Sequence, residues 1–104
     1  MEKDILKIEG EVTQEQIEAW KREYGTIVEG RADDCVAYFK RPSRQQISYA
    51  QTLQNDPLKM AETLLKACFV GGSDKIYTDL EHLLGAGSIV DSLITIKTIE
   101  VKKL

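Results

Sequence analysis

The sequence predicts an α+β domain that is mainly helical. Helix-start residues followed by helical apolar spacing occur at Thr13, Ser43 and Asp56. Between the first two, residues 26–40 are rich in β-branched and aromatic side chains, which are typical of strands. The chain has 104 residues, 42% hydrophobic and 30% charged. That size and balance suit one domain, residues 1–104, with a single modest core.

The first helix is expected to begin after Thr13 and to end at Gly25. Thr13 and Gln16 have the spacing of a capping box, in which each side chain bonds the other residue's backbone amide. Apolar side chains then recur at helical spacing on one face: Ile17, Trp20 and Tyr24. Glycine is the usual residue just past a helix end.

A β-hairpin is expected next, with strands at residues 26–29 and 35–39. Turn-forming residues separate the two runs: Gly30, Asp33 and Asp34. Because a lone hairpin is marginal in water, it must lie against helices or gain a third strand. The short apolar stretch at residues 5–8 is the candidate for that third strand.

Two further helices are expected to form an αα-hairpin that builds the core. Ser43 and Gln46 form a second capping box, and Asp56 followed by Pro57 marks the start of the next helix. The second helix is expected to run to Val70, where two glycines stop it. Its apolar positions make a wide stripe: Leu58, Met60, Ala61, Leu64, Leu65, Ala67 and Cys68.

One or two helices are expected after residue 72. A short one follows from the apolar spacing of Ile76, Leu80, Leu83 and Leu84. Ser88, with Asp91 three residues later, resembles another capped start. Residues 89–101 fit either a helix or a strand, and the lysines at 102 and 103 favour a helix C-terminus. This apolar segment would dock within the monomer or against a second copy, so a homo-oligomer is possible.

Charge and composition exclude several classes of protein. The net charge of −3 disfavours wrapping of nucleic acid, which requires a basic face. No apolar run approaches the roughly 20 residues that span a bilayer, so no membrane partner is expected. The first residues lack the pattern of a signal peptide, which predicts a cytoplasmic protein. In that reducing compartment, Cys35 and Cys68 are expected to be small buried hydrophobes.

No group of residues predicts catalysis, a metal site or a cofactor. His82 is the only histidine, and its position on the 76–84 helix points away from the apolar stripe, towards solvent. A metal site made of Cys35, Cys68 and His82 lacks the usual ligand spacing and a fourth ligand. The glycine-containing loops at residues 71–75 and 85–88 lack the glycine spacing and the Lys-Ser/Thr ending of a phosphate-binding loop. We therefore expect a protein that is not an enzyme.

A basic cluster at the start of the Ser43 helix is the one feature that breaks a local rule. Lys40, Arg41 and Arg44 place positive charge where the helix dipole disfavours it. The cluster either pairs with Glu29, Asp33 or Asp34 across the hairpin, or it contacts an acidic partner. Aromatic residues that prove exposed would be anchors for such a partner. The candidate partner-binding residues are Tyr38, Lys40, Arg41, Arg44 and Tyr49.

Several stretches together resemble small tail-assembly chaperones of tailed phages and prophages. The matching stretches are residues 20–25 (WKREYG), 38–44 (YFKRPSR), Asp56 with Pro57, 64–72 (LLKACFVGG) and 84–88 (LGAGS). The resemblance implies a mainly helical, non-enzymatic protein of the bacterial host cytoplasm. It also implies that the chain binds the long helical tape-measure protein while a phage tail assembles. No catalytic residue follows from it.

Two other functions remain open from the sequence. The chain could be a small regulator that contacts nucleic acid through Lys40, Arg41 and Arg44, although the acidic balance makes nucleic acid an unlikely partner. It could also be a phage structural protein of another kind. The leading expectation is an assembly chaperone or adaptor that presents a groove between helices, or the hairpin edge, to an apolar helical protein.

Overall fold

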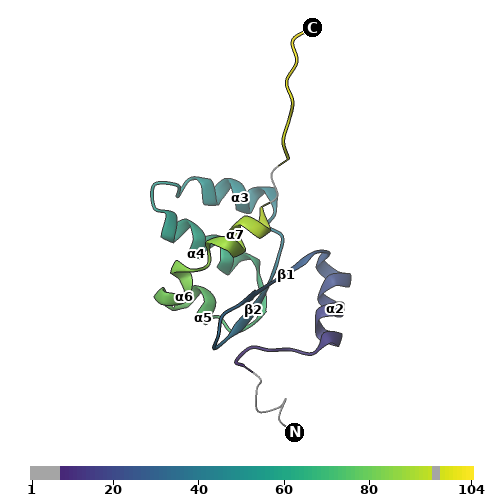
Figure 1. Cartoon of the computed structure of the whole chain (residues 1–104), viewed down its shortest axis with the longest axis vertical. Coiled ribbons are helices and arrows are strands. Elements are labelled where there is room, and N and C mark those ends of the chain that lie inside the picture. The colour runs from purple at the N-terminus through teal and green to yellow at the C-terminus, as the bar shows by residue number, and fades with distance from the viewer. Residues whose placement is uncertain (1–7, 95–96) are drawn as a thin grey trace.

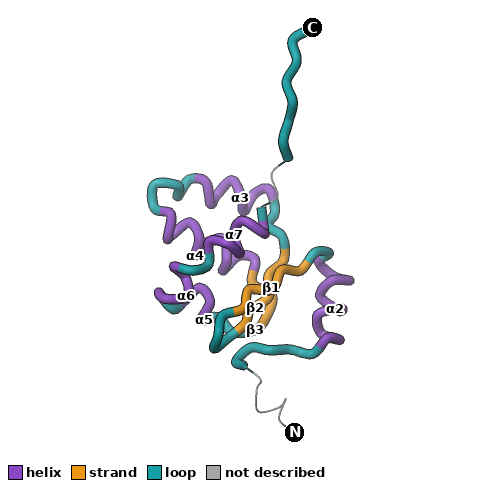
Figure 2. The backbone as a smooth tube through the Cα atoms, viewed as in Figure 1, coloured by secondary structure: helices purple, strands orange, loops and turns teal. Residues whose placement is uncertain are grey.

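The fold is a three-stranded antiparallel sheet between one helix and a layer of helices (Figure 1). The computed structural model describes residues 8–94 and 97–104. In chain order the elements are α2 (Gln14–Tyr24), β1 (Ile27–Arg31), β2 (Val36–Lys40), α3 (Arg44–Gln51), α4 (Pro57–Cys68), β3 (Phe69–Gly72), α5 (Lys75–Thr78), α6 (Leu80–Leu84) and α7 (Gly87–Leu93). Helix α2 covers one face of the sheet, and α4 to α7 lie on the other side (Figure 2). The predicted α+β class is confirmed.

The predicted helix starts at Thr13, Ser43 and Asp56 are confirmed. The Thr13 hydroxyl accepts a hydrogen bond from the backbone N–H of Gln16, which satisfies one half of the predicted box. Both halves form at Ser43, whose hydroxyl and backbone amide exchange bonds with Gln46. Asp56 accepts from the backbone of Lys59. Each bond satisfies an amide that would otherwise lack a partner in the first helical turn.

The predicted hairpin is confirmed, but the third strand comes from another part of the chain. β2 pairs with β1 on one side and with β3 on the other. The helix predicted to run to Val70 ends at Cys68, and Phe69 begins β3. Gly72 has φ +97, and a Cβ there would lie 2.6 Å from the Val36 carbonyl oxygen, so only glycine fits. The strand predicted at residues 5–8 lies largely outside the described residues.

The C-terminal third differs from the prediction in three ways. The single helix predicted through residues 76–84 is two short helices, α5 and α6, which meet at Asp79. Helix α7 begins at Gly87 with Ala86 as its cap, and Ser88 does not cap it. Of the helix predicted over residues 89–101, α7 ends at Leu93, residues 95–96 lie outside the described residues, and residues 97–104 form neither helix nor strand. Ile94, whose β-branched side chain disfavours a helix, has an extended backbone at the end of α7.

The core lies between the sheet and the helical layer. The buried side chains come from the end of the β1–β2 turn, from β2, from α4 and from the short helices: Cys35, Ala37, Phe39, Leu64, Leu65, Cys68, Ile76, Leu83 and Leu93. Both cysteines are buried and free, as predicted. On the opposite face of the sheet, the Trp20 and Tyr38 ring centroids are 5.4 Å apart. Within the described residues, none of the helices has the length and apolar character that crossing a bilayer requires.

Candidate functional site

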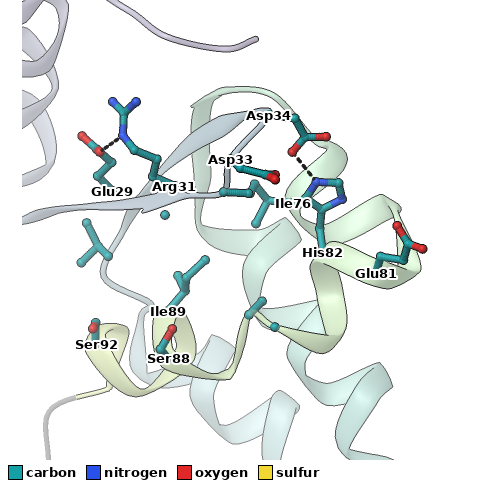
Figure 3. Close-up of a pocket in the computed structure, with 15 residues that line it drawn as sticks. Glu29, Arg31, Asp33, Asp34, Ile76, Glu81, His82, Ser88, Ile89 and Ser92 are labelled. Atoms are coloured by element: carbon teal, nitrogen blue, oxygen red, sulfur yellow. Dashed lines mark hydrogen bonds and ion pairs between the residues drawn. The ribbon is translucent and has the colours of Figure 1, made fainter. Parts of the chain in front are cut away.

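An open groove of about 830 Å³ runs along β1 on the side of the sheet that faces α6 and α7 (Figure 3). Residues 28–34, from β1 and the turn after it, form one wall. Ile76 and residues of α6 and α7 form the other wall, including His82 and Ile89. We call this feature the β1 groove. It was not predicted, because its two walls come from segments about 50 residues apart in the chain.

The groove is apolar at its base because β1 and α7 approach closely there. Val28, Ile76 and Ile89 supply aliphatic surface. Gly30 is buried, and a Cβ at that position would lie 2.4 Å from Cδ1 of Ile89. Glycine therefore lets the helix lie against the strand. Because side chains alternate along a strand, Glu29 and Arg31 point to the other side of β1, as Figure 3 shows.

The outer edge of β1 carries backbone groups that no strand of the described residues pairs with. The amide of Ala32 donates to the Cys35 carbonyl at 2.8 Å, which makes this a hydrogen-bonded pair of the hairpin. Hydrogen-bonded pairs alternate along an antiparallel ladder, so Val28 and Gly30 also bond to β2. The amides and carbonyls of Ile27, Glu29 and Arg31 therefore point outward, where another strand could pair with them.

Acidic side chains predominate around the groove. Asp33, Asp34 and Glu81 line it together with His82, whereas Glu29 and Arg31 belong to its β1 wall but point their side chains to the other side of the strand. Glu29 is paired, since its carboxylate lies 2.8 Å from Nε of Arg31. A second carboxylate, on Glu11, lies 3.5 Å from the same guanidinium. The hydrogen bond to Glu29 raises the pKa of Arg31 above its ordinary value.

His82 closes one end of the groove, between two carboxylates. Its Nε2 lies 2.8 Å from Asp34 in the β1–β2 turn, and its Nδ1 lies 2.9 Å from Asp79. The prediction that His82 faces solvent is wrong, since only 12% of its side chain is exposed. The sequence analysis expected Asp34 in the hairpin turn but did not predict this contact. Helical spacing could not reveal it, because Asp34 lies 48 positions away in the sequence.

The two carboxylates favour the protonated imidazole. Hydrogen bonding to Asp34, and then the charges of Asp34 and Asp79, raise the pKa of His82 above its ordinary value of 6.5. The same bond lowers the pKa of Asp34. A protonated imidazole donates from both nitrogens, so it satisfies both acids at once. The cluster thereby links α6 to the hairpin turn.

The cluster also contains three atoms of the kinds that bind metals. The ligand atoms of Asp34, Cys35 and His82 lie within 4.8 Å of one another. Oxygen, sulfur and nitrogen together are a donor set that zinc accepts. However, both His82 nitrogens already bond carboxylates, and burial raises the pKa of the Cys35 thiol, which opposes the thiolate that a metal needs. The geometry is accounted for by the His82 hydrogen bonds alone.

A second polar cluster ties the start of the described chain to the end of β3. The carboxylate of Glu9 accepts from the Ser73 hydroxyl at 2.8 Å and lies 2.9 Å from Nζ of Lys75. These bonds lower the pKa of Glu9 and raise that of Lys75. Backbone pairing between Glu9 and Cys35 runs alongside. The cluster is satisfied internally, and we assign it a structural role.

The predicted partner-binding residues do not form one surface. Tyr38 is buried, with 1% of its surface exposed, and it packs against Trp20. Lys40 lies over the Tyr24 ring, with Nζ 4.9 Å from the centroid. Arg41, Arg44 and Tyr49 are exposed. Five positions separate Arg44 from Tyr49 on α3, which places them about 140° apart around the helix.

Two of the acids proposed as partners of the basic cluster bond other residues instead. Glu29 bonds Arg31, and Asp34 bonds His82, so these two acids are occupied by other residues. Lys40 instead stacks on an aromatic ring from α2, which helps to hold that helix against the sheet. Sequence spacing alone could not reveal that Asp34 bonds His82 or that Lys40 stacks on Tyr24, because each contact joins separate elements of the chain.

Exposed apolar side chains lie mainly on the helical layer and on the C-terminal segment. Leu80 and Leu84 on α6 are 57% and 67% exposed, and Tyr49 on α3 is 60% exposed. The first two are four residues apart, so they share one face of α6. The sequence placed both leucines on an apolar stripe with Ile76 and Leu83, but only the latter two are buried.

Comparison of the chain with models of protein families, with curated proteins and with solved structures gave no match.

Proposed function

We propose that this chain is a non-enzymatic adaptor or chaperone of phage or prophage tail assembly, acting in the cytoplasm of the bacterial host. Its client would be an apolar helical protein such as a tape-measure protein. The observation that carries the proposal is the exposed leucine pair on α6, Leu80 and Leu84. The resemblance of several sequence stretches to tail-assembly chaperones supports the same function.

The leucine pair suits a helical client. Side chains four residues apart on a helix form a short ridge, which packs into the groove between turns of another helix. Burial of one leucine side chain contributes about 1.5–3 kcal/mol, so two exposed leucines leave a substantial driving force for association. Tyr49 on α3 is another exposed apolar side chain. A client with an apolar stripe would cover these side chains and gain solubility.

Co-expression with the tape-measure protein of the same gene cluster tests the proposal. We expect the wild-type chain to raise the soluble fraction of the client and to co-purify with it. Replacement of both leucines, Leu80→Gln with Leu84→Gln, should lower the co-purified amount at least about tenfold, since a buried leucine contributes more than 1.4 kcal/mol. Circular dichroism should show an unchanged melting temperature, because both side chains are exposed.

The control replaces an exposed apolar residue elsewhere, Leu58→Gln on α4, and should leave client binding unchanged. Failure of the wild-type chain to co-purify with the client would overturn the proposed client. An equal loss of client in the leucine double variant and in the control would overturn the α6 surface as the binding site. Binding to duplex DNA at low salt, where the electrostatic term is strongest, would favour a nucleic-acid regulator instead.

A further inference from the structure

Two features of the described chain are complementary and have no partner within it. The first is the outer edge of β1, whose outward backbone groups lie beside the β1 groove. The second is the C-terminal segment, residues 97–104, which forms neither helix nor strand. In Figure 1 this segment extends away from the folded body. The apolar side chains of residues 97–104 therefore do not pack against the folded body of the same chain.

The C-terminal segment has the pattern of a strand with one apolar face. Ile99 and Val101 are 76% and 87% exposed, and they lie on the same side of an extended chain. The alternate positions are polar: Thr98, Glu100 and Lys102. Eight extended residues span about 26 Å, whereas the five residues of β1 span about 17 Å. The segment is thus long enough to pair with the whole edge.

We propose that residues 97–104 of one copy add as an antiparallel strand to the outer edge of β1 in a second copy. Ile99 and Val101 would enter the β1 groove beside Ala32 and Gly30, where Ile89 packs against the strand. Reciprocal exchange of the two segments would close a two-fold dimer, in which the same surfaces meet twice. This inference concerns self-association and is independent of the proposed client.

The charges along the two strands select one register. In that register Glu100 lies opposite Arg31, and Lys102 lies opposite Glu29. Both pairs have opposite charge, and both β1 residues direct their backbone groups outward, as strand pairing requires. A parallel arrangement with Glu100 opposite Glu29 would place like charges together. In the antiparallel register, Val101 lies opposite Gly30, with its side chain on the α7 side.

The C-terminal segment and the β1 groove also have opposite overall charge. The segment contains lysines at 97, 102 and 103 and one glutamate, whereas carboxylates predominate around the groove. Exposed charges on an edge strand, such as Glu29 and Arg31, normally discourage pairing with unrelated strands. Here the same charges would admit the C-terminal segment of a second copy and disfavour strands that lack the complementary pattern.

A disulfide in the proposed register tests the inference. Glu29→Cys and Lys102→Cys are placed in one chain, and the native thiols do not compete because Cys35 and Cys68 are buried. Opposed residues of a hydrogen-bonded pair have Cα atoms about 5.5 Å apart, which a disulfide can bridge. Mild oxidation at micromolar protein concentration should give a covalent dimer on a non-reducing gel, and a reductant should reverse it.

A chain with Glu29→Cys and Lys103→Cys is the matched control, since residue 103 would point to the other face. This control should give at least about fivefold less covalent dimer than the chain with Glu29→Cys and Lys102→Cys. A cross-linked monomer would overturn the inference in favour of docking within one chain. Equal dimer in both variants, or no cross-link in either, would also overturn it.

Light scattering after gel filtration provides an independent measurement. The wild-type chain should have the mass of a dimer, and deletion of residues 97–104 should give a monomer with unchanged helical circular dichroism. Glu29→Lys alone and Lys102→Glu alone should each weaken the dimer about two- to fivefold, and the double exchange should restore it. A wild-type monomer at all concentrations up to about 1 mM would overturn the inference.

Discussion

Nε2 of His82 lies 2.8 Å from a carboxylate oxygen of Asp34, a residue 48 positions earlier in the chain. This contact joins α6 to the turn between β1 and β2, and the bond from Nδ1 to Asp79 holds the ring in place. The imidazole thus connects the helical layer to the sheet at one end of the β1 groove. Its protonation state should affect how firmly these parts hold together.

We expect the stabilising effect of His82 to depend on pH. Its folded-state pKa is raised above 6.5, so the contribution is complete below pH 6.5 and is lost as the pH rises through the folded-state pKa. The pKa of Asp34 is lowered, so its contribution is present above about pH 4 and is lost as the pH falls through the folded value. Urea unfolding should therefore distinguish wild type from His82→Gln most clearly near pH 5.5.

Near pH 9, the difference in urea midpoint between wild type and His82→Gln should be smaller. Because the chain contains one histidine, no other imidazole titrates in this range. A difference in urea midpoint that stays constant from pH 5.5 to pH 9 would contradict the assignment of a charged imidazole between the two carboxylates.

Gly71→Ala should destabilise the fold by about 1–3 kcal/mol, because overpacking forces neighbouring groups apart. A Cβ at this position would lie 2.5 Å from the Trp20 ring, a rigid group that also packs on Tyr38. Gly87→Ala is the matched control, since a Cβ there meets nothing within 4 Å. The control should change the free energy of unfolding by no more than about 1 kcal/mol, in the stabilising direction. Chemical denaturation measures both.

Ser43→Ala should lower the free energy of unfolding by about 1 kcal/mol, because it removes the cap of α3. The backbone amide of Gln46 would lose its acceptor, and the reciprocal bond would lose its orientation. Ser48→Ala, at an exposed position within the same helix, should be neutral or slightly stabilising. Equal effects of the two substitutions would show that the cap contributes nothing.

Both cysteines should resist alkylation in the folded protein. Burial raises the pKa of Cys68 to about 11 and also raises that of Cys35, so little thiolate forms near pH 8. Iodoacetamide at pH 8 should leave the native chain unmodified over an hour and modify both thiols in denaturant, as mass spectrometry would show. Rapid labelling of either thiol without denaturant would contradict the packed arrangement around β2 and α4.

Local signals in the sequence predicted much of the fold. The caps at Ser43 and Asp56 depend on bonds to residues three positions away, and spacing alone reveals such bonds. The two strands of the hairpin were recognisable for the same reason, since adjacent β-rich runs flank a turn. These elements form largely independently of the rest of the chain.

Long-range contacts decide the features that the sequence did not predict. Phe69 continues the helical apolar pattern of α4, yet it begins a strand because β2 offers backbone partners. Val70 and the two glycines that follow looked like the end of a helix. Gly71 is instead a position where the Trp20 ring approaches the strand closely. The β1 groove and the His82 cluster likewise depend on segments that meet only in the folded state.

The position of Trp20 makes the attachment of α2 observable. Trp20 is the only tryptophan, and its ring rests on Tyr38 and Gly71 at the face of the sheet opposite the main core. Helix α2 has no fully buried residue of its own. Intrinsic fluorescence therefore monitors the detachment of α2, while the ellipticity at 222 nm monitors mostly the other helices. If the fluorescence transition preceded the loss of ellipticity on heating, α2 would be a separately melting unit.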